Sequence, residues 1–337
     1  MKIILCTGDS HTCGQGADNV MSRDKVKDPK KVYVPQGKGL GLNSFEFPSY
    51  VNLLREHILK NYNSTFLLLT AEELISSYGC KSKQNEREMP VALVEKELIL
   101  KNKRDLIVLS VFEQTCEAVF DVFVDKKLYA THTLHTPMPR YNEFSVRHIF
   151  IKCENAKEVR LVAKKGELLL NNIQLCSGNY AVINSGIGWC PSSRYQTECF
   201  DYAVKDACPD VVIAEAHTIN DWLIMDSPKK HYNSLCNYLD KLHKLTDKIM
   251  LVTVSPILHI QGGEHNLFYK DFMAEAKRLS TRNDIVFADA NAEFEKALAN
   301  VPACKHEEFM FVDNAHVNAR GHKIYADTII KNLDKLL

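Results

Sequence analysis

The chain has 337 residues, and its 42 lysines and arginines balance 42 aspartates and glutamates, so the formal net charge at pH 7 is zero. A neutral balance argues against a nucleic-acid partner, which calls for a basic surface. No apolar run reaches the roughly 20 residues that a membrane-spanning helix needs, so no membrane partner is expected. A chain of this length is expected to form two domains.

The eleven cysteines show no spacing typical of a disulfide framework or a zinc site. Cys116, Cys153 and Cys176 lie in apolar, strand-like segments, where cysteine behaves as a small hydrophobe. No signal-peptide pattern precedes the first strand-like segment. We therefore expect reduced thiols and a cytoplasmic location.

In chain order, the first element is an apolar strand that ends at Gly8-Asp9-Ser10. Residues 21–42 are polar and rich in Lys, Pro and Gly, which predicts a long loop. Residues 47–58 contain Pro48 near their start and repeat apolar residues at helical spacing, which predicts a helix.

The next strand of a βα unit should follow that helix within a few residues, but the next match, residues 180–184, comes much later. Residues 63–177 are therefore interpreted as an inserted, mainly-β accessory domain. Short β-branched and aromatic runs separated by polar turns indicate a β-sandwich or jelly roll; they cover residues 106–112, 118–124, 147–151 and 158–162, with a hairpin turn at 125–127. A carbohydrate-binding role and a purely structural role both stay open for this domain.

After residue 178, predicted strands and helices alternate along the chain. This alternation predicts an α/β domain with a parallel sheet covered by helices on both faces. In such sheets the functional site lies beyond the carboxyl ends of the strands. The predicted strands are 180–184, 211–216, 249–254 and 285–289, and the predicted helices are 193–207, 231–248, 266–280 and 294–298.

Ser10 ends the first strand, while Asp313 and His316 lie near the other end of the chain, ahead of a last helix. A serine nucleophile needs a base within hydrogen-bond reach, and that base needs a third group to fix its tautomer. Residues three apart on a helical turn share a face, so Asp313 could orient His316 directly. Ordinary interpretations stay open, because an Asp ahead of a helix is a common N-cap and Gly-Asp-Ser is a common turn.

Gly8-Asp9-Ser10 after an N-terminal strand, together with Asp313-x-x-His316, resembles the SGNH (GDSL-type) hydrolase superfamily. Residues 217–222 resemble the family's Gly-x-Asn-Asp block, although Thr218 stands where the family usually has glycine. Residues 184–189 resemble the block that supplies a glycine. The resemblance covers the two ends of the chain rather than its middle.

The resemblance implies a flavodoxin-like three-layer sandwich with a central parallel sheet, formed by residues 1–62 and 178–337. It implies that Ser10 is the nucleophile, His316 the base and Asp313 the orienting carboxylate. The implied oxyanion hole consists of the Ser10 N–H, the Gly188 N–H and the Asn220 amide, with Gly186 as the alternative glycine. No cofactor is implied. Asp9 is expected to brace the turn through backbone hydrogen bonds.

We therefore expect a serine esterase that hydrolyses short acyl esters, most simply acetyl, of a carbohydrate or a similar polar alcohol. The expected partner is a small-molecule or oligosaccharide ester, held by Trp189, Trp222 and His259. The alternatives are a lysophospholipase or thioesterase and, from another class, a non-catalytic carbohydrate-binding protein. The sequence leaves a homo-oligomer open.

Gly8-Asp9-Ser10-His11 also fits the Gly-Asp-x-His start of metallophosphoesterases, in which Asp and His bind one metal of a two-metal site. That chemistry requires further Gly-Asp-x-x-Asp and Gly-Asn-His loops, which the sequence lacks. The histidines are scattered without metal-ligand spacing. Metal-dependent phosphoester hydrolysis is therefore the weaker interpretation, and no metal is expected.

Overall fold

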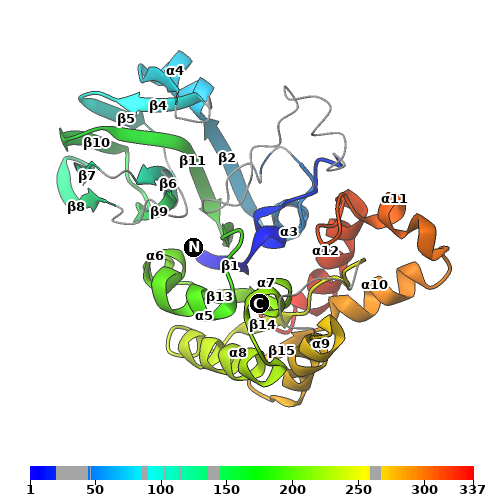
Figure 1. Cartoon of the computed structure of the whole chain (residues 1–337). Coiled ribbons are helices and arrows are strands. Elements are labelled where there is room, and N and C mark those ends of the chain that lie inside the picture. Colours follow the sequence, from blue (N-terminus) through cyan, green and yellow to red (C-terminus); the bar gives the residue numbers. More distant parts are fainter. Residues whose placement is uncertain are drawn as a thin grey trace. The chain divides into compact units, whose positions relative to one another are not determined.

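A computed structural model of the protein describes residues 1–19, 45, 47–84, 90–101, 104–113, 116–135, 145–258 and 267–337 (Figure 1). The chain forms two compact units. The β unit contains Leu59–Ala181, and the α/β unit contains Val182–Leu337 with the described residues of Lys2–Gly37 and Asn43–Ile58. The sequence predicted boundaries after residues 62 and 177, whereas the compact units divide after residues 58 and 181.

The α/β unit is built on a five-stranded sheet of order β12-β1-β13-β14-β15. The pairs β1–β13, β13–β14 and β14–β15 are parallel, which confirms the predicted parallel sheet. The strands are short, nearly continuous apolar runs, because both faces of the sheet are covered. Their bounds are β1 Lys2–Gly8, β12 Tyr180–Gly186, β13 Val211–Glu215, β14 Ile249–Val252 and β15 Val286–Ala288.

The helices of this unit form two contact groups, one in which α8 contacts α5 and α9 and another in which α12 contacts α10 and α11. Ser227 caps α8 by accepting the Lys230 N–H. Pro228 occupies the first helical position, where a backbone N–H would have no acceptor within the helix. The helices are α1 Ser10–Cys13, α3 Tyr50–Asn61, α5 Ser192–Arg194, α6 Phe200–Ala203, α7 Thr218–Ile224, α8 Pro228–Leu242, α9 Tyr269–Arg278, α10 Ala290–Leu298, α11 His306–Met310 and α12 Ala319–Leu333.

The single helix predicted over residues 193–207 is wrong, because this segment changes its helical type along its length. A π-helical turn, Tyr195–Cys199, separates α5 from α6, and a 3₁₀ turn, Lys205–Ala207, follows. Two buried side chains anchor the π turn: the Tyr195 hydroxyl donates to the Ser185 carbonyl, and the Gln196 amide donates to Ser234. These tertiary bonds favour the wider turn over a regular helix.

The β unit consists of two antiparallel sheets. One has the order β5-β10-β7-β8, and the other has the order β3-β4-β11-β6-β9, with β2 also paired to β11. The four strands predicted from sequence are confirmed as β6, β7, β9 and β10. Bounds are β2 Ser64–Thr70, β3 Lys81–Gln84, β4 Pro90–Val94, β5 Glu97–Lys101, β6 Leu106–Glu113, β7 Ala118–Val124, β8 Lys127–Leu134, β9 Ser145–Lys152, β10 Glu158–Lys165 and β11 Leu168–Gly178.

The predicted hairpin turn joins β7 to β8. Asp125 and Lys126 both have positive φ, at 44° and 68°. Two consecutive residues in this region form the turn whose twist matches that of the flanking strands, which explains a two-residue connection. The short helix α4 (Ala71–Tyr78), which the sequence did not predict, begins with a capping box between Thr70 and Glu73.

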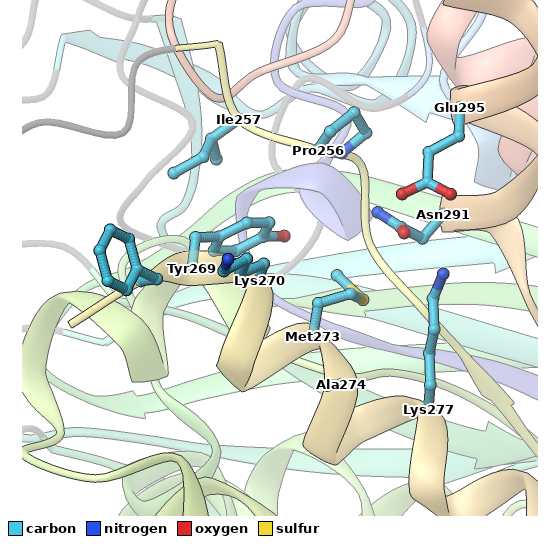
Figure 2. Close-up of a pocket in the computed structure, with 10 residues that line it drawn as sticks. Pro256, Ile257, Tyr269, Lys270, Met273, Ala274, Lys277, Asn291 and Glu295 are labelled. Carbon is cyan, nitrogen blue, oxygen red and sulfur yellow. The ribbon is translucent and has the colours of Figure 1, made fainter.

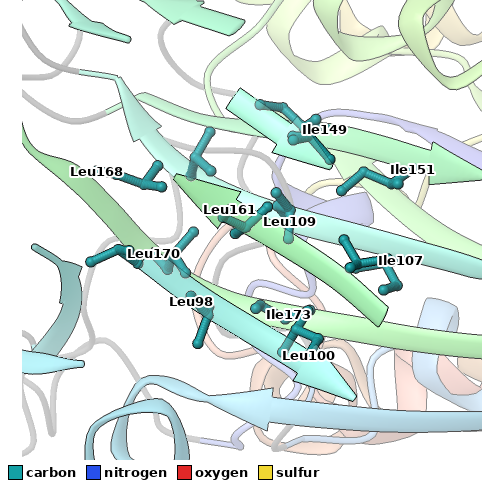
Figure 3. Close-up of a cluster of buried hydrophobic side chains, with 14 of the residues drawn as sticks. Leu98, Leu100, Ile107, Leu109, Ile149, Ile151, Leu161, Leu168, Leu170 and Ile173 are labelled. Atoms are coloured by element: carbon teal, nitrogen blue, oxygen red, sulfur yellow. The ribbon is translucent and has the colours of Figure 1, made fainter. Parts of the chain in front are cut away.

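One hydrophobic core joins the two sheets of the β unit (Figure 3). Leu98, Leu100 and Leu161 from one sheet share this core with Leu109 and Ile173 from the other. Burial alternates along β5, as expected for a strand with one face in the core and one toward solvent. Because each fully buried Leu or Ile contributes about 1.5–3 kcal/mol, this shared core is the main source of the unit's stability. The two antiparallel sheets around one core fit the predicted inserted β domain.

All eleven cysteines lie in the described residues, where none forms a disulfide, and eight of them are buried or half-buried. The closest described contact between two of them joins the Sγ atoms of Cys190 and Cys199, at 4.0 Å. Among the described helices, none has the length and apolar character needed to cross a bilayer.

Candidate active site

The turn that carries Ser10 follows directly from the end of β1. Asp9 caps α1, and its Oδ1 accepts the His11 N–H at 3.1 Å, so Asp9 braces the turn as predicted. Ser10 begins α1 and is 6% exposed. Gly8 is required here, because a Cβ at this position would lie 2.4 Å from Glu215 Oε2.

Ser10, His316 and Asp313 form one connected hydrogen-bonded set. Ser10 Oγ lies 2.9 Å from His316 Nε2, across 306 positions of sequence. His316 Nδ1 lies 2.7 Å from Asp313 Oδ2. An ionised carboxylate only accepts, so the Nδ1 proton faces Asp313 and the bare Nε2 faces the serine hydroxyl. The longer contact of Ser10 Oγ, to Asp9 Oδ1, measures 3.5 Å.

The contact between Asp313 and His316 is made in a bend rather than on a helical turn, so the predicted helical geometry is wrong. Asp313 Oδ1 accepts the N–H groups of Ala315 and His316, at 2.9 and 2.7 Å, as in an Asx turn. Asp313 does not cap the last helix, because Asn318 fills that role for α12. Burial raises the pKa of Asp313, but hydrogen bonds and the charge of His316 outweigh it and hold the pKa below its ordinary value.

Asn220 lies in the first turn of α7, directly after β13, and is 6% exposed. Its Nδ2 donates to Asp9 Oδ2 at 2.6 Å. A carboxamide nitrogen carries two protons, so the bond to Asp9 orients the group and leaves a second N–H for another acceptor. The chain enters α7 through His217, whose φ of 54° makes the sharp turn from the strand.

The two candidate glycines have different surroundings. The Gly186 N–H donates to Asn184 Oδ1 at 3.0 Å, and a Cβ on Gly186 would lie 2.5 Å from the Cys13 nitrogen. Gly186 therefore permits close packing of β12 against α1, and its amide is already bonded. Gly188 lies in the following turn, and within the described residues its N–H meets no hydrogen-bond acceptor.

A buried charged cluster beneath Ser10 was not predicted from sequence. Glu215 ends β13 with 2% exposure, and its Oε2 accepts the N–H groups of Asp9 and Thr12, both at 3.2 Å, and the Thr12 hydroxyl. The available signal was an acidic residue at the end of an otherwise apolar strand. Such a group is rarely buried without partners.

His11 completes this cluster. Its Nδ1 lies 3.3 Å from Asp9 Oδ1 and 3.5 Å from Glu215 Oε1, and its Nε2 lies 3.0 Å from the Ala315 carbonyl oxygen. Burial lowers the pKa of His11, but hydrogen bonds to Asp9 and Glu215 and the charges of both carboxylates raise it well above its ordinary value. Burial and the charge of Asp9 raise the pKa of Glu215.

A cavity of about 420 Å³ lies in the α/β unit between α9, α10 and the segment after β14 (Figure 2). The segment is joined to the loop of His316 by two bonds: Leu258 N–H donates to the Asn314 carbonyl at 3.0 Å, and Ser255 Oγ lies 3.5 Å from the Ala315 carbonyl. Figure 2 shows Lys277, Asn291 and Glu295 on one side and Ile257 and Tyr269 on the other. The cavity lining is Pro256, Ile257, Phe268, Tyr269, Lys270, Met273, Ala274, Lys277, Asn291 and Glu295.

The residues predicted to bind substrate lie in three different settings. Trp222 is 6% exposed, packs with Tyr269 and donates its Nε1–H to the Leu267 carbonyl at 2.9 Å, which is the setting of a core side chain. Trp189 is 64% exposed. His259 lies outside the described residues. Neither Trp189 nor Trp222 is among the described residues that line the cavity, and the sequence did not single out the residues that do.

No protein-family model matches the sequence, and no curated protein matches it. Similar solved structures include a peptidoglycan O-acetylesterase at 14% identity, which covers 100% of this chain and 91% of that chain with a TM-score of 0.49. A Bacillus subtilis protein at 10% identity covers 80% of this chain and 88% of its own, with a TM-score of 0.43. The match to an acetylxylan esterase from Geobacillus stearothermophilus, at 16% identity, covers 46% of this chain and 73% of that chain, with a TM-score of 0.38. These likenesses are remote in sequence.

Proposed function

We propose that the protein is a serine esterase of the SGNH type, with Ser10, His316 and Asp313 as its catalytic triad. The observation that carries the proposal is the continuous path from Ser10 Oγ to His316 Nε2 and from His316 Nδ1 to Asp313 Oδ2, at 2.9 and 2.7 Å. A binding protein with a disabled site would not need both contacts. The intact set therefore favours an enzyme over a non-catalytic carbohydrate-binding protein.

In this mechanism Ser10 Oγ attacks the ester carbonyl while His316 Nε2 takes its proton. Asp313 keeps the imidazole in the tautomer with a bare Nε2 and stabilises the imidazolium that forms. The tetrahedral intermediate collapses when His316 returns the proton to the leaving alcohol, which yields an acyl-enzyme on Ser10. Water, activated by the same histidine, then releases the acid and restores the serine.

Three donors are proposed for the oxyanion: the Ser10 N–H, the Gly188 N–H and the second N–H of Asn220. The proposal is supported because none of these three N–H groups donates to an acceptor within the described residues. Gly188 is preferred to Gly186, because Asn184 already binds the Gly186 N–H. Donors held in place before the reaction stabilise the developing charge without reorganisation.

The topology supports the same proposal. Numbered along the α/β unit, the strands have the spatial order 2-1-3-4-5, which is the flavodoxin-like order. We propose that this unit has the three-layer SGNH arrangement, with helices on both faces of the sheet. Ser10 and Asn220 then follow the carboxyl ends of β1 and β13, where ligands bind in open sheets of this kind.

We propose that the substrate is a short acyl ester, most simply acetyl, of a carbohydrate or similar polar alcohol, and that no cofactor takes part. None of Ser10, Asp313 and His316 is among the residues that line the cavity of about 420 Å³; its support as the site of a ring-sized alcohol portion is that the Ser255–Leu258 segment bonds to the loop of His316. Phe268, 54% exposed, offers an aromatic face, and Lys277, Asn291 and Glu295 offer partners for hydroxyl groups. A lysophospholipase or thioesterase is the second candidate, favoured by the apolar side chains of Ile257, Tyr269 and Met273 in the same lining.

The deciding experiment compares p-nitrophenyl acetate, butyrate and octanoate as substrates of wild type, Ser10→Ala and Ser110→Ala. We expect turnover that is fastest on acetate, absent in Ser10→Ala and unchanged in Ser110→Ala, which removes a buried hydroxyl in the β unit. Acetate release from acetylated sugars would then be measured. Equal turnover by Ser10→Ala would refute the serine mechanism, and a preference for octanoate would favour the second candidate.

A further inference from the structure

We propose that His11 and Glu215 are positioning residues that hold the turn of Ser10 against the loop of His316; this inference rests on the proposed esterase function. Neither residue belongs to the catalytic triad or to the oxyanion donors. Both are almost completely buried, at 1% and 2% exposure. Glu215 contacts the backbone on both sides of Ser10, and the His11 ring contacts the backbone next to His316.

Glu215 fixes the nucleophile turn from below. Its Oε2 accepts the N–H of Asp9, immediately before Ser10, and the N–H of Thr12, two residues after it. The Thr12 hydroxyl donates to the same oxygen. One carboxylate oxygen therefore restrains the backbone on both sides of Ser10, and Gly8 leaves the space that lets the carboxylate approach so closely.

His11 joins this turn to the loop of the base. Its Nε2 donates to the carbonyl of Ala315, the residue directly before His316, at 3.0 Å. On its other side, Nδ1 faces Asp9 and Glu215. A carbonyl oxygen only accepts, so the Nε2 proton is required, and the two carboxylates favour a second proton on Nδ1. The His11 ring thus connects the backbone at position 315 to the carboxylates that brace Ser10.

Because this cluster is buried, its charged groups would lower the stability of the fold unless they were arranged to pair with one another. Two carboxylates and an imidazole without solvent are tolerated only when each charge is paired and hydrogen-bonded. The contact between Ser10 Oγ and His316 Nε2 joins two segments that come from opposite ends of the sequence. Because a misplacement of about 1 Å at a reacting centre can cost about 10²-fold in rate, such a connection has a catalytic consequence.

Asp9, His11 and Glu215 place one potential ligand atom each within 4.8 Å of one another, a spacing close enough for a metal ion to be considered. Backbone N–H groups, however, already occupy oxygens of both carboxylates, and a carbonyl oxygen faces His11 Nε2. The remaining Glu215 oxygen, Oε1, accepts no hydrogen bond within the described residues and lies 3.5 Å from His11 Nδ1, as in an ion pair. We therefore assign the cluster to positioning, and the experiment includes a metal analysis.

The test compares His11→Gln with His11→Asn, since the two amides reach different ends of the missing ring. The glutamine amide extends toward the Nε2 position and can donate to the Ala315 carbonyl, whereas the asparagine amide reaches only the carboxylates. On p-nitrophenyl acetate we expect His11→Asn to lose about 10²-fold in kcat with KM unchanged, and His11→Gln to recover a large part of that loss. Glu215→Gln should likewise retain more kcat than Glu215→Ala.

His148→Gln is the matched control, because His148 is a buried histidine of the β unit at 2% exposure. It should lower the melting temperature without changing kcat. A kcat for His11→Asn equal to that of wild type, no recovery in His11→Gln, or a stoichiometric metal in the purified protein would overturn the positioning role. Full activity of Ser10→Ala would instead refute the esterase mechanism itself, so the two failures are distinguishable.

Discussion

Within the described residues, one serine–histidine contact lies in the β unit and another in the α/β unit, and their hydrogen-bond patterns differ. In the β unit, Ser110, His148 and Asn172 lie side by side on β6, β9 and β11. Ser110 Oγ donates to Asn172 Oδ1 at 2.9 Å and contacts His148 Nδ1 at 3.1 Å. In the α/β unit, Ser10 Oγ faces the Nε2 of His316, whose Nδ1 is held by a carboxylate.

The difference lies in where each proton can go. The Ser110 proton is committed to an amide oxygen, so His148 cannot act as its base, and the cluster serves as cross-strand hydrogen bonding. The Ser10 proton faces a bare ring nitrogen, and the third group binds the histidine instead of the serine. Residue types alone therefore do not define a catalytic site; the order of the hydrogen bonds does.

The largest effect should come from the third group of the catalytic set. Asp313→Asn keeps an oxygen for the Ala315 and His316 N–H groups but places an amide against His316 Nδ1, which favours the wrong tautomer. We expect kcat to fall by about 10⁴-fold, as for other triads with this change. Steady-state kinetics on p-nitrophenyl acetate measure it. Asn172→Ala, the corresponding change in the β unit, should leave kcat unaltered, and a kcat loss there would invalidate the comparison.

Asn220→Ala should have the next largest effect. It removes one proposed oxyanion donor and the amide that orients Asp9. We expect kcat to drop by about 10²–10³-fold, with a smaller change in KM. A change confined to KM would assign Asn220 to substrate binding rather than to transition-state stabilisation.

Ser110→Ala should affect stability and not catalysis. Removal of the hydroxyl leaves the buried Asn172 oxygen without its donor, so the free energy of unfolding should fall by about 1–3 kcal/mol. Urea denaturation measures this change, with Ser76→Ala on the exposed face of α4 as the control. An unchanged midpoint for Ser110→Ala would mean that the cluster has no structural role.

The smallest effect concerns the pH dependence contributed by a histidine that stays neutral. Burial lowers the pKa of His322 from 6.5 to about 3, and its Nε2 lies 3.0 Å from the Gln15 carbonyl. Between these values the unfolded chain binds more protons than the folded one, so the free energy of unfolding should decrease as pH falls from 6.5 toward 3. His322→Gln should flatten this slope in urea titrations at pH 7, 5 and 4. An identical slope would contradict the assignment.

The sequence was sufficient to predict the buried strands of the parallel sheet, whose ends lie within two residues of the predicted ones, and to predict that Ser10 lies at a carboxyl end of this sheet. The catalytic roles of Ser10, Asp313 and His316 stay a prediction. It did not predict Glu215, since an acidic residue at a strand end usually faces solvent and its burial depends on partners far away in sequence. The contact between Asp313 and His316 was predicted, but on a helical turn instead of in a bend, because a spacing of three residues fits both. The pairing of β2 with β11 joins segments too distant for any local pattern to reveal.

The two strands at the ends of the β unit are partners of one another. β2 and β11 pair antiparallel, with Ser64 opposite Gly178, and the Tyr180 N–H donates to Ser64 Oγ at 2.9 Å. The polypeptide therefore enters and leaves the β unit at almost the same point. We therefore expect that the β unit can be excised and the two chain ends rejoined by a short linker.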